Sequence, residues 1–592
     1  MSFSNLPTEL HLKIAEYLTS NDLLVCIRLS KYNFATFCPV LWHSVIAFDF
    51  DGLVHREDHL SQQPSPLPLS ALASSHPCHH NDGEEPDSQS ESTIELKSEM
   101  NQECLDFGTI LPRYSQHIFQ LTLFSVKSLH DLGPACTNLT TLRFGFLLDF
   151  ATPETQSLHA LCSPSTLQKF RNDRGTTVVT ISQILQQNPW LQSVGLKLPP
   201  SDDATMVLET LKGLRFLEEL DIDWTRSRWQ NELEQTEDAH QEQESGQSMG
   251  MDAAGSQRRP RRSFHCPQHI YNILDGCHCL RKLRIAGNAN ENENEHQMLQ
   301  IHPEDYRTHT LLQALDLSRG GSFFQTNLIW KAIGLSPALH TLELPQELSK
   351  SDVRALVEII QDHCPWIESL AFSSDLPAGE GPDHGDIGDI IDAVNCLRHV
   401  VLRQATIVDR RSILELLHAH ANSIESLEIK RMYDIGHQET DVPALLVHLP
   451  RLKRFVSDTP LSLHKIIEYY QQPSQQQDQP TLSSGNDNIT ALSSSSFSNT
   501  TNLRVLDICV ARLRQEEELS IADQDAFTAW ICSSFKDLET LVIRHWDPTQ
   551  YEYAPHTSDV ALDIPRIQGS LRQMKFLRTA QIFGQVLDVD TL

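Results

Sequence analysis

The feature that most constrains this chain is a short apolar motif that recurs along most of its length. In the stretch Ile367–Phe372, apolar residues occupy the first, fourth and sixth positions, and the last two alternate with a residue that must face the other way in a strand. An amphipathic segment, residues 355–363, precedes this stretch, and Cys364-Pro365 separates the two. A unit of this size cannot bury its apolar side alone, so the pattern predicts a stacked array of copies.

Copies of the motif extend from about residue 115 to about residue 580. The central residues of the clear copies are Leu121, Leu142, Val194, Leu220, Leu283, Leu315, Leu342, Leu370, Val400, Leu427, Leu506 and Leu541, and those of the weaker copies are Phe170, Phe455 and Met574. From Leu315 to Phe455 the central residues are separated by 27, 28, 30, 27 and 28 positions. Self-similarity at a fixed period indicates a repeat architecture.

A helix is expected before each strand of the array. Asp202, Asp352, Asp409 and Asp523 each lie eighteen residues before a central strand residue and begin an apolar helical pattern. Aspartate is a preferred N-cap residue, and we expect each of these caps to stabilise its helix by ~1 kcal/mol. The repeating unit is therefore a capped helix, a turn and a strand.

This unit resembles the leucine-rich repeat of the longer, helix-containing type, with about fifteen copies. The resemblance implies an α/β solenoid of helix–turn–strand repeats, each of about 27–30 residues, with parallel strands on the concave face, over residues 111–592. Polar stretches near 228–262, 288–304 and 471–500 are expected to be disordered insertions. Such solenoids are generic binding scaffolds, so the resemblance predicts architecture and leaves function open.

The bulk composition narrows the classes of protein to which this chain of 592 residues can belong. A net charge of −31 argues against a surface for nucleic acid, because phosphate contacts need clustered lysine and arginine. No window approaches the roughly 18 apolar residues of a membrane span, and no signal peptide opens the chain. The odd number of cysteines, 13, favours reduced thiols. We therefore expect a cytoplasmic and/or nuclear protein with no nucleic-acid or membrane partner.

The first 48 residues form a separate pattern. Pro7 suits the first turn of a helix, Thr19 to Asp22 end that helix and offer caps for the next, and a third segment extends to Cys38-Pro39. Three helices of this length cannot bury all their apolar side chains among themselves. The sequence predicts a helical domain over residues 1–48, with either a docking face or a cap on the next domain. An acidic, Ser/Pro-rich linker, expected to be disordered, follows over residues 49–110.

The order Leu6-Pro7-x-Glu9-Leu10, Ile14, Tyr17-Leu18, Asp22-Leu23 and Pro39-x-Leu41-Trp42 resembles an F-box. One departure is Tyr32-Asn33-Phe34 after Ser30-Lys31, where many members carry a tryptophan. The resemblance implies docking on the Skp adaptor of a cullin-based ubiquitin ligase. The residues that it assigns to adaptor binding are Leu6, Pro7, Glu9, Leu10, Ile14, Leu18, Leu23, Leu41 and Trp42.

The residue between the last two apolar positions of each strand is expected to face the concave side. These candidate target-binding residues are Arg143, Asp221, Arg284, Asp316, Glu343, Glu428 and Asp507. The set is charged and mainly acidic, which favours a target segment with basic residues.

Motifs for catalysis or cofactor binding do not occur in the sequence, so we expect no enzyme activity, no cofactor and no metal. Cys277 lies near several other cysteines and histidines, but it occupies the repeat position of Cys364 and Cys136, which favours a structural turn residue over a zinc ligand.

Two functions remain open. The first is a substrate-recognition adaptor of a Skp–cullin–F-box ubiquitin ligase, in which the repeats capture an unknown target protein. The alternative is a leucine-rich-repeat scaffold that acts outside a ligase, with the N-terminal helices as an end cap.

Overall fold

A computed structural model describes most of the predicted repeats and the N-terminal helices. The described residues are 8–47, 54–55, 115–123, 136–144, 166–173, 178–198, 204–224, 266–287, 308–319, 327–345, 348–373, 387–403, 413–430, 442–464, 466–467, 502–513, 520–545, 557–558 and 562–587. The predicted insertions and nearly all of the predicted linker lie outside them. The chain divides into two compact units, Met1–Thr180 and Ile181–Leu592.

The first unit begins with three helices, α1 (Thr8–Glu16), α2 (Ser20–Leu29) and α3 (Lys31–Leu41). Thr19 caps α2 in a capping box with Asp22, and Ser30 caps α3 by accepting a hydrogen bond from the amide of Asn33. The core between the helices is small and consists of Ala15, Leu23, Phe37 and Leu41. We call these three helices the N-terminal module.

The chain then leaves α3 as a strand. The strands of this unit are β1 (Ser44–Ala47), β2 (Val54–His55), β3 (Gln120–Leu123), β4 (Thr141–Phe144) and β5 (Lys169–Asn172). β1 pairs in parallel with β3, β3 with β4 and β4 with β5, while β2 pairs antiparallel with β1. The apolar tail of the N-terminal module is thus a strand of the repeat sheet, which the sequence pattern did not predict.

The second unit holds one long parallel sheet. Its parallel strands are β6 (Ser193–Lys197), β7 (Glu219–Asp223), β8 (Lys282–Ala286), β9 (Ala314–Arg319), β10 (Thr341–Pro345), β11 (Ser369–Ser373), β12 (His399–Arg403), β13 (Ser426–Lys430), β14 (Arg454–Ser462), β15 (Val505–Leu513), β16 (Thr540–His545) and β18 (Thr579–Ile582). Each of these strands pairs with the next along the chain. β17 (Thr557–Ser558) and β19 (Gln585–Leu587) pair antiparallel with β15 and β18.

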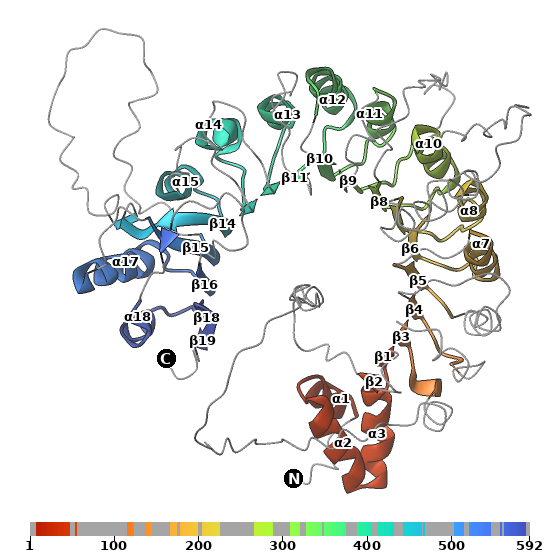
Figure 1. Cartoon of the computed structure of the whole chain (residues 1–592), viewed down its shortest axis with the longest axis horizontal. Coiled ribbons are helices and arrows are strands. Elements are labelled where there is room, and N and C mark those ends of the chain that lie inside the picture. Colours follow the sequence, from red (N-terminus) through yellow and green to blue (C-terminus); the bar gives the residue numbers. More distant parts are fainter. Residues whose placement is uncertain are drawn as a thin grey trace, which may run out of the picture. The chain divides into compact units, whose positions relative to one another are not determined.

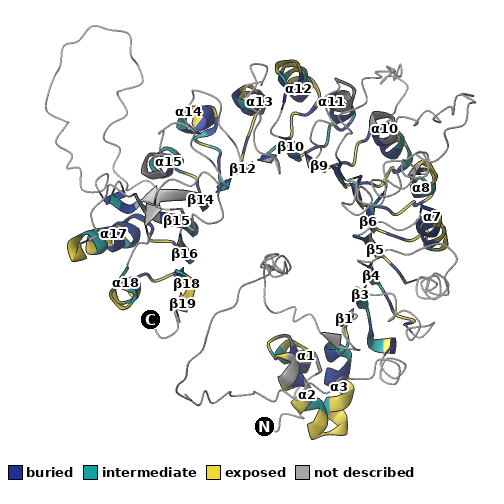
Figure 2. Cartoon of the chain, viewed as in Figure 1, coloured by how far each residue is buried: buried dark blue, intermediate teal, exposed yellow. Residues whose placement is uncertain are grey.

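Helices precede most of these strands and lie on one side of the sheet (Figure 1). They are α7 (Val178–Gln187), α8 (Ala204–Leu211), α10 (Cys266–Gly276), α11 (Asn327–Gly334), α12 (Lys350–His363), α13 (Ile387–Ala393), α14 (Ile413–Leu417), η7 (His418–His420), α15 (Val442–His448), α17 (Ile521–Ser534) and α18 (Ile564–Leu571). We call the opposite side of the sheet its inner face. Figure 2 shows buried residues concentrated where helices and strands meet, so the core is one continuous layer between them.

The register of the strands confirms the repeat array. In the second unit the predicted central residues lie side by side from Val194 on β6 to Leu541 on β16. Leu121, Leu142 and Phe170 do the same in the first unit. The last copy was predicted in the wrong frame, because Ala580, not Met574, pairs with Leu541. Both frames carry apolar residues, but β18 begins only at Thr579.

The helix caps follow a different chemistry from the one predicted. Ser349 caps α12 and Ser520 caps α17, whereas Asp352 and Asp523 occupy the third helical position of each capping box. Each carboxylate accepts from the amide of its serine, at 3.2 Å for Asp352 and 3.0 Å for Asp523. The aspartates thus stabilise the helix ends, but they are not the N-cap residues. Asp202 and Asp409 lie outside the described residues.

The buried cysteines act as turn residues between helix and strand. The Cys277 thiol donates to the carbonyl of Leu211 at 3.6 Å, and the Cys364 thiol donates to that of Ile333 at 3.4 Å. Asn188 holds the same position before β6 and donates to the carbonyl of Ile184 at 2.8 Å. Burial raises the pKa of each thiol to about 12, which keeps it neutral. The interpretation of Cys277 as a structural residue is confirmed.

Candidate functional site

The N-terminal module leaves several large apolar side chains exposed. Leu10 and Leu12 on α1 are 47 % and 40 % exposed, and Tyr17 follows at 82 %. On α2, Val25 is 58 % exposed and Leu29 70 %. Several large apolar side chains exposed on so short a segment favour an interaction site.

The residues assigned to adaptor binding divide into two groups. Leu10 is exposed, and Ile14, Leu18 and Trp42 are half-buried. Leu23 and Leu41, 0 % and 7 % exposed, belong to the core of the module. The core pair can shape the docking surface, but it does not line it. Leu6 and Pro7 lie outside the described residues, as does the side chain of Glu9.

Sequence reasoning missed a polar residue at the centre of the module. His11 is fully buried, and its Nδ1 lies 3.3 Å from the hydroxyl of Tyr32. The His11 ring also meets the rings of Tyr32 and Phe37 edge-on, with centroids 5.5 and 6.1 Å apart. His11 lies four residues before Ala15 and seven before Leu18, on one face of a helix, and this spacing was the available signal in the sequence. The contact of His11 with Tyr32 and Phe37 links α1 to α3.

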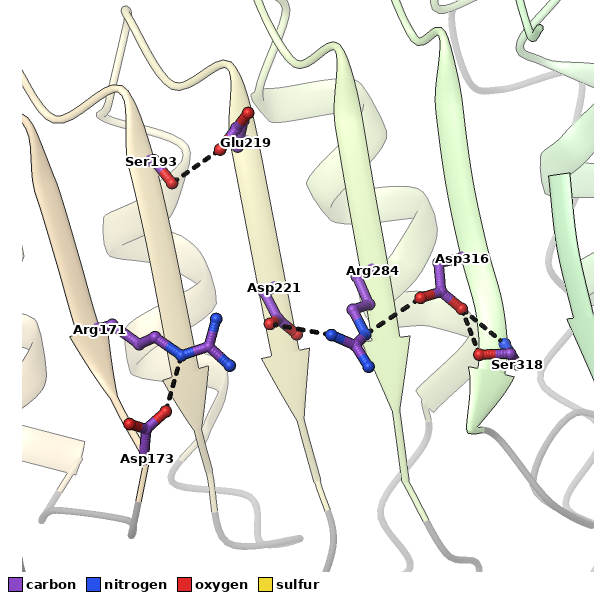
Figure 3. A network of polar contacts seen from close by, with 8 residues as sticks. All are labelled: Arg171, Asp173, Ser193, Glu219, Asp221, Arg284, Asp316 and Ser318. Carbon is purple, nitrogen blue, oxygen red and sulfur yellow. Dashed lines mark hydrogen bonds and ion pairs between the residues drawn. The ribbon is translucent and has the colours of Figure 1, made fainter. Parts of the chain in front are cut away.

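The second candidate site is the row of residues at the middle of each strand on the inner face. Figure 3 shows Arg284 on β8 between Asp221 on β7 and Asp316 on β9. The Nε of Arg284 lies 3.1 Å from a carboxylate oxygen of Asp316, and its Nη1 lies 3.8 Å from Asp221. Asp316 also accepts hydrogen bonds from the amide and hydroxyl of Ser318, at 2.9 and 2.6 Å. The structure therefore brings together three of the seven candidate target-binding residues.

Asp507 belongs to a second cluster. Arg544 on β16 donates from Nε to the carboxylate of Asp507 at 2.7 Å and pairs through Nη1 with Asp458 on β14. Burial raises the pKa of Asp507, and the positive charge of Arg544 opposes part of that rise. These contacts tie three consecutive strands together.

Glu428 and its neighbours form a third cluster. Lys430, on the same strand, lies 2.6 Å from the Glu428 carboxylate, and Arg454 on β14 lies 3.9 Å from it.

The two remaining candidate residues lie outside these clusters. Glu343 is half-buried beside Asp316 in register, and its other neighbour in the row is the buried Ala371. In the first unit, Arg143 on β4 pairs with Asp173. Asp173 also accepts a hydrogen bond from Arg171 at 2.7 Å, which Figure 3 shows.

The inner face is thus less acidic than the mid-strand residues alone indicated. Each of these clusters contains lysine or arginine, and ion pairs, most of them between strands, offset the charge of the carboxylates. Such pairs, partly exposed to solvent, contribute at most about 1 kcal/mol each. Their main consequence is to fix the order of charges along the sheet. An ordered pattern selects partners by complementary order and does not attract every basic segment equally.

No group of three or more histidine, cysteine, aspartate or glutamate side chains with the geometry of a metal site occurs among the described residues. No described helix has the length and apolar character that crossing a membrane requires.

Comparisons with known proteins add little to this picture. No protein-family model and no curated protein matches the chain. Among solved structures, the chain is similar to the leucine-rich repeat-containing protein LegL7 from Legionella pneumophila, with 12 % identity and a TM-score of 0.30 over 55 % of this chain and 93 % of that one. It is also similar to the complex of Rad7 and Elc1 in yeast, with 13 % identity and a TM-score of 0.30 over 77 % of each chain. At this TM-score neither likeness supports a functional statement, and the repeat architecture rests on its own strand register.

Proposed function

We propose that this chain is a non-catalytic substrate-recognition adaptor of a Skp–cullin–F-box ubiquitin ligase, acting in the cytoplasm and/or the nucleus. The N-terminal module would be an F-box that docks on the Skp adaptor and, through it, on a cullin. The repeats would capture the target protein on their inner face. Ubiquitin transfer would then follow from proximity, without a catalytic group in this chain.

The observation that carries the proposal is the exposed apolar surface of the N-terminal module. The F-box-like residues fold into three short helices packed on a small cluster of buried apolar residues, Ala15, Leu23, Phe37 and Leu41. Leu10, Tyr17 and Leu29 nevertheless remain between 47 % and 82 % exposed. Exposing apolar side chains to water is unfavourable in free energy, and a helical partner that covers them removes this unfavourable contribution.

The test is co-purification of the full-length chain with the Skp adaptor. Leu10→Asp places a charge in the docking surface, and we expect adaptor binding to be lost. Leu311→Asp is a matched control, because Leu311 is 45 % exposed but lies in the repeats. We expect it to leave adaptor binding unchanged. Equal adaptor binding by both variants, or no binding by a folded wild-type chain, would contradict the proposal.

One observation favours the alternative, a repeat scaffold outside a ligase. Strand β1 continues directly from α3 and pairs in parallel with β3, which lengthens the repeat sheet of the first unit. The carbonyl of His43 accepts hydrogen bonds from the amides of Phe119 and Gln120, at 3.1 and 2.9 Å. The same pair of bonds links later strands, which supports an end-cap role for the N-terminal region in the alternative function. A cap without adaptor binding would leave the chain free of Skp in every preparation.

A further inference from the structure

One turn position in the repeats carries exposed apolar side chains in the first part of the second unit. It is the residue directly before the first buried apolar residue of each strand motif, and we call it the rim position. Trp190, Phe216, Leu311 and Trp366 occupy it and are 54 %, 46 %, 45 % and 63 % exposed. The rings of Trp190 and Phe216 stack with centroids 5.0 Å apart.

The fold itself does not require apolar residues at the rim position. Later repeats carry Ser423, Arg451, Asn502 and Asp537 there, and only in the last described repeat does an apolar residue return, Phe576, which is 48 % exposed. Their strands pair in the same register and bury the same motif residues as the earlier ones. Because polar side chains serve equally well in those repeats, the exposed rings of the earlier repeats are better explained by a partner.

The spacing of the apolar rim positions favours a helical partner. Neighbouring strands lie about 4.8 Å apart. Phe216, Leu311 and Trp366 directly precede β7, β9 and β11, so they are two strand spacings, ~10 Å, apart, and Trp190 before β6 stacks on Phe216. In an α-helix, residues seven apart lie on one face and are separated by ~10.5 Å. In an extended strand, side chains on one face are ~6.8 Å apart, which does not match.

Charges next to the rim have a fixed order. Glu218 and Glu219 are exposed at the start of β7, near Phe216, and Arg281 and Lys282 are exposed at the start of β8. The acidic pair at β7 and the basic pair at β8 are therefore one strand spacing, about 4.8 Å, apart. This distance is close to the ~4.5 Å rise of three residues in a helix. A helix with a base near its first apolar anchor and an acid one turn later complements this order.

We propose that the rim positions from Trp190 to Trp366 bind an amphipathic helix of the partner, with apolar residues seven apart and a base followed by an acid on one flank. The proposal rests on the proposed function in one respect, since that function makes this helix part of the captured target.

A synthetic peptide of about 21 residues provides the probe. It carries leucine at three positions seven apart, a lysine beside the first leucine and a glutamate one turn later on the same flank. Its binding to the full-length chain is measured by fluorescence anisotropy. Cys279 is exposed at the rim position of β8, and Cys396 is exposed at that of β12, beyond the apolar set. We expect the bound peptide to protect Cys279 from maleimide alkylation and to leave Cys396 reactive.

Variants of the chain and of the peptide separate the contributions. We expect Phe216→Asn to weaken peptide binding about tenfold, as loss of a central aromatic anchor does in other interfaces. Leu311→Asp is a second variant that keeps the test valid if the first fails to fold, and we expect it to abolish binding. Asp537→Asn, at the rim position of β16, is the control and should bind the peptide normally. A peptide with lysine and glutamate exchanged should bind about fivefold more weakly.

Three results would overturn the inference. These are no peptide binding at about 100 μM, equal binding by Leu311→Asp and Asp537→Asn, or protection of Cys279 by a proline-rich peptide in place of the helical one. Co-purification of Skp with the same preparations tests the proposed function independently of peptide binding. Peptide binding without Skp would remove the ligase role and keep the rim site, and Skp binding without peptide binding would do the reverse.

Discussion

The N-terminal module and the repeats solve the same burial problem in opposite ways. In the repeats each strand motif lies between two others, so Leu342, Leu370 and Val400 are all fully buried. In the module, three helices pack on a small cluster around Leu23 and Phe37, and Leu10, Tyr17 and Leu29 stay exposed. Each repeat buries the apolar side chains of its neighbour, whereas no second copy of the module occurs among the described residues. Its exposed surface is therefore available to a different protein, which is what an adaptor requires.

The largest effect should come from breaking a repeat while leaving the module intact. Leu370→Asp buries a carboxylate between Leu342 and Val400, and we expect a loss of several kcal/mol in the free energy of unfolding. Leu10→Asp should change it by no more than about 0.5 kcal/mol, because Leu10 is exposed. Urea denaturation of the full-length chain measures both. Similar losses in the two variants would show that Leu10 belongs to a core.

A smaller effect is expected for a hydrogen bond between neighbouring repeats. Trp330 on α11 donates from Nε1 to Asp352 on α12 at 2.7 Å, and both residues are buried. We expect Trp330→Phe to cost about 1–3 kcal/mol, beyond the loss of ring volume, because the buried carboxylate loses a donor. Trp530→Phe is the matched control, since the buried Trp530 Nε1 has no hydrogen-bond partner among the described residues. Equal costs in thermal denaturation would mean that only ring volume matters.

The buried turn thiols should make repeat stability depend on alkaline pH. Burial raises the pKa of Cys364 from 9.0 to about 12, so its thiol stays neutral in the folded chain after it would ionise in the unfolded one. Its contribution to stability is complete below pH 9 and is lost as the pH rises toward 12. Cys364→Ala removes this dependence, so the stability difference between wild type and variant should shrink between pH 9 and 11. A difference that stays constant with pH would place the thiol in solvent.

The smallest effect concerns the ion pairs of the inner face. Arg284→Gln removes the pairs with Asp221 and Asp316, but the arginine side chain is 28 % exposed and solvent screens the charges. We expect less than about 1 kcal/mol in urea denaturation, and less again at high salt. A larger loss would make this cluster part of the core and would weaken the contrast between buried motif residues and inner-face residues.

The sequence was sufficient for the repeat architecture because its signal is periodic. Residues such as Leu315 and Phe455 pair where their spacing predicts, since one frame buries every motif residue at once. The last repeat was predicted in the wrong frame, because α18 and the turn after it also carry apolar residues, from Leu571 to Leu577, at strand-like spacing. The helix caps were predicted at aspartate, whereas serine three residues earlier is the cap. Aspartate is favoured both at the N-cap and in the first helical turn, so its presence does not distinguish the two positions.

The candidate site was less predictable for a physical reason. Asp507 and Arg544 are 37 residues apart, and their contact depends on strand register and on side-chain rotamers that no local pattern contains. The mid-strand residues were therefore identified as a charged row, but their neutralising partners were not. The exposed rim residues were not predicted, because an apolar residue directly before a strand motif cannot be distinguished in the sequence from the buried residues of the motif.

In the proposed function, the N-terminal module is the docking site for the Skp adaptor. The most direct test is titration of the purified full-length chain with purified Skp adaptor in a calorimeter. We predict one saturable site, with a negative heat-capacity change from burial of Leu10 and its apolar neighbours, and loss of the site in Leu10→Asp but not in Leu311→Asp. A folded wild-type chain that releases no heat with Skp at any temperature, and does not bind it in sedimentation, would contradict the claim.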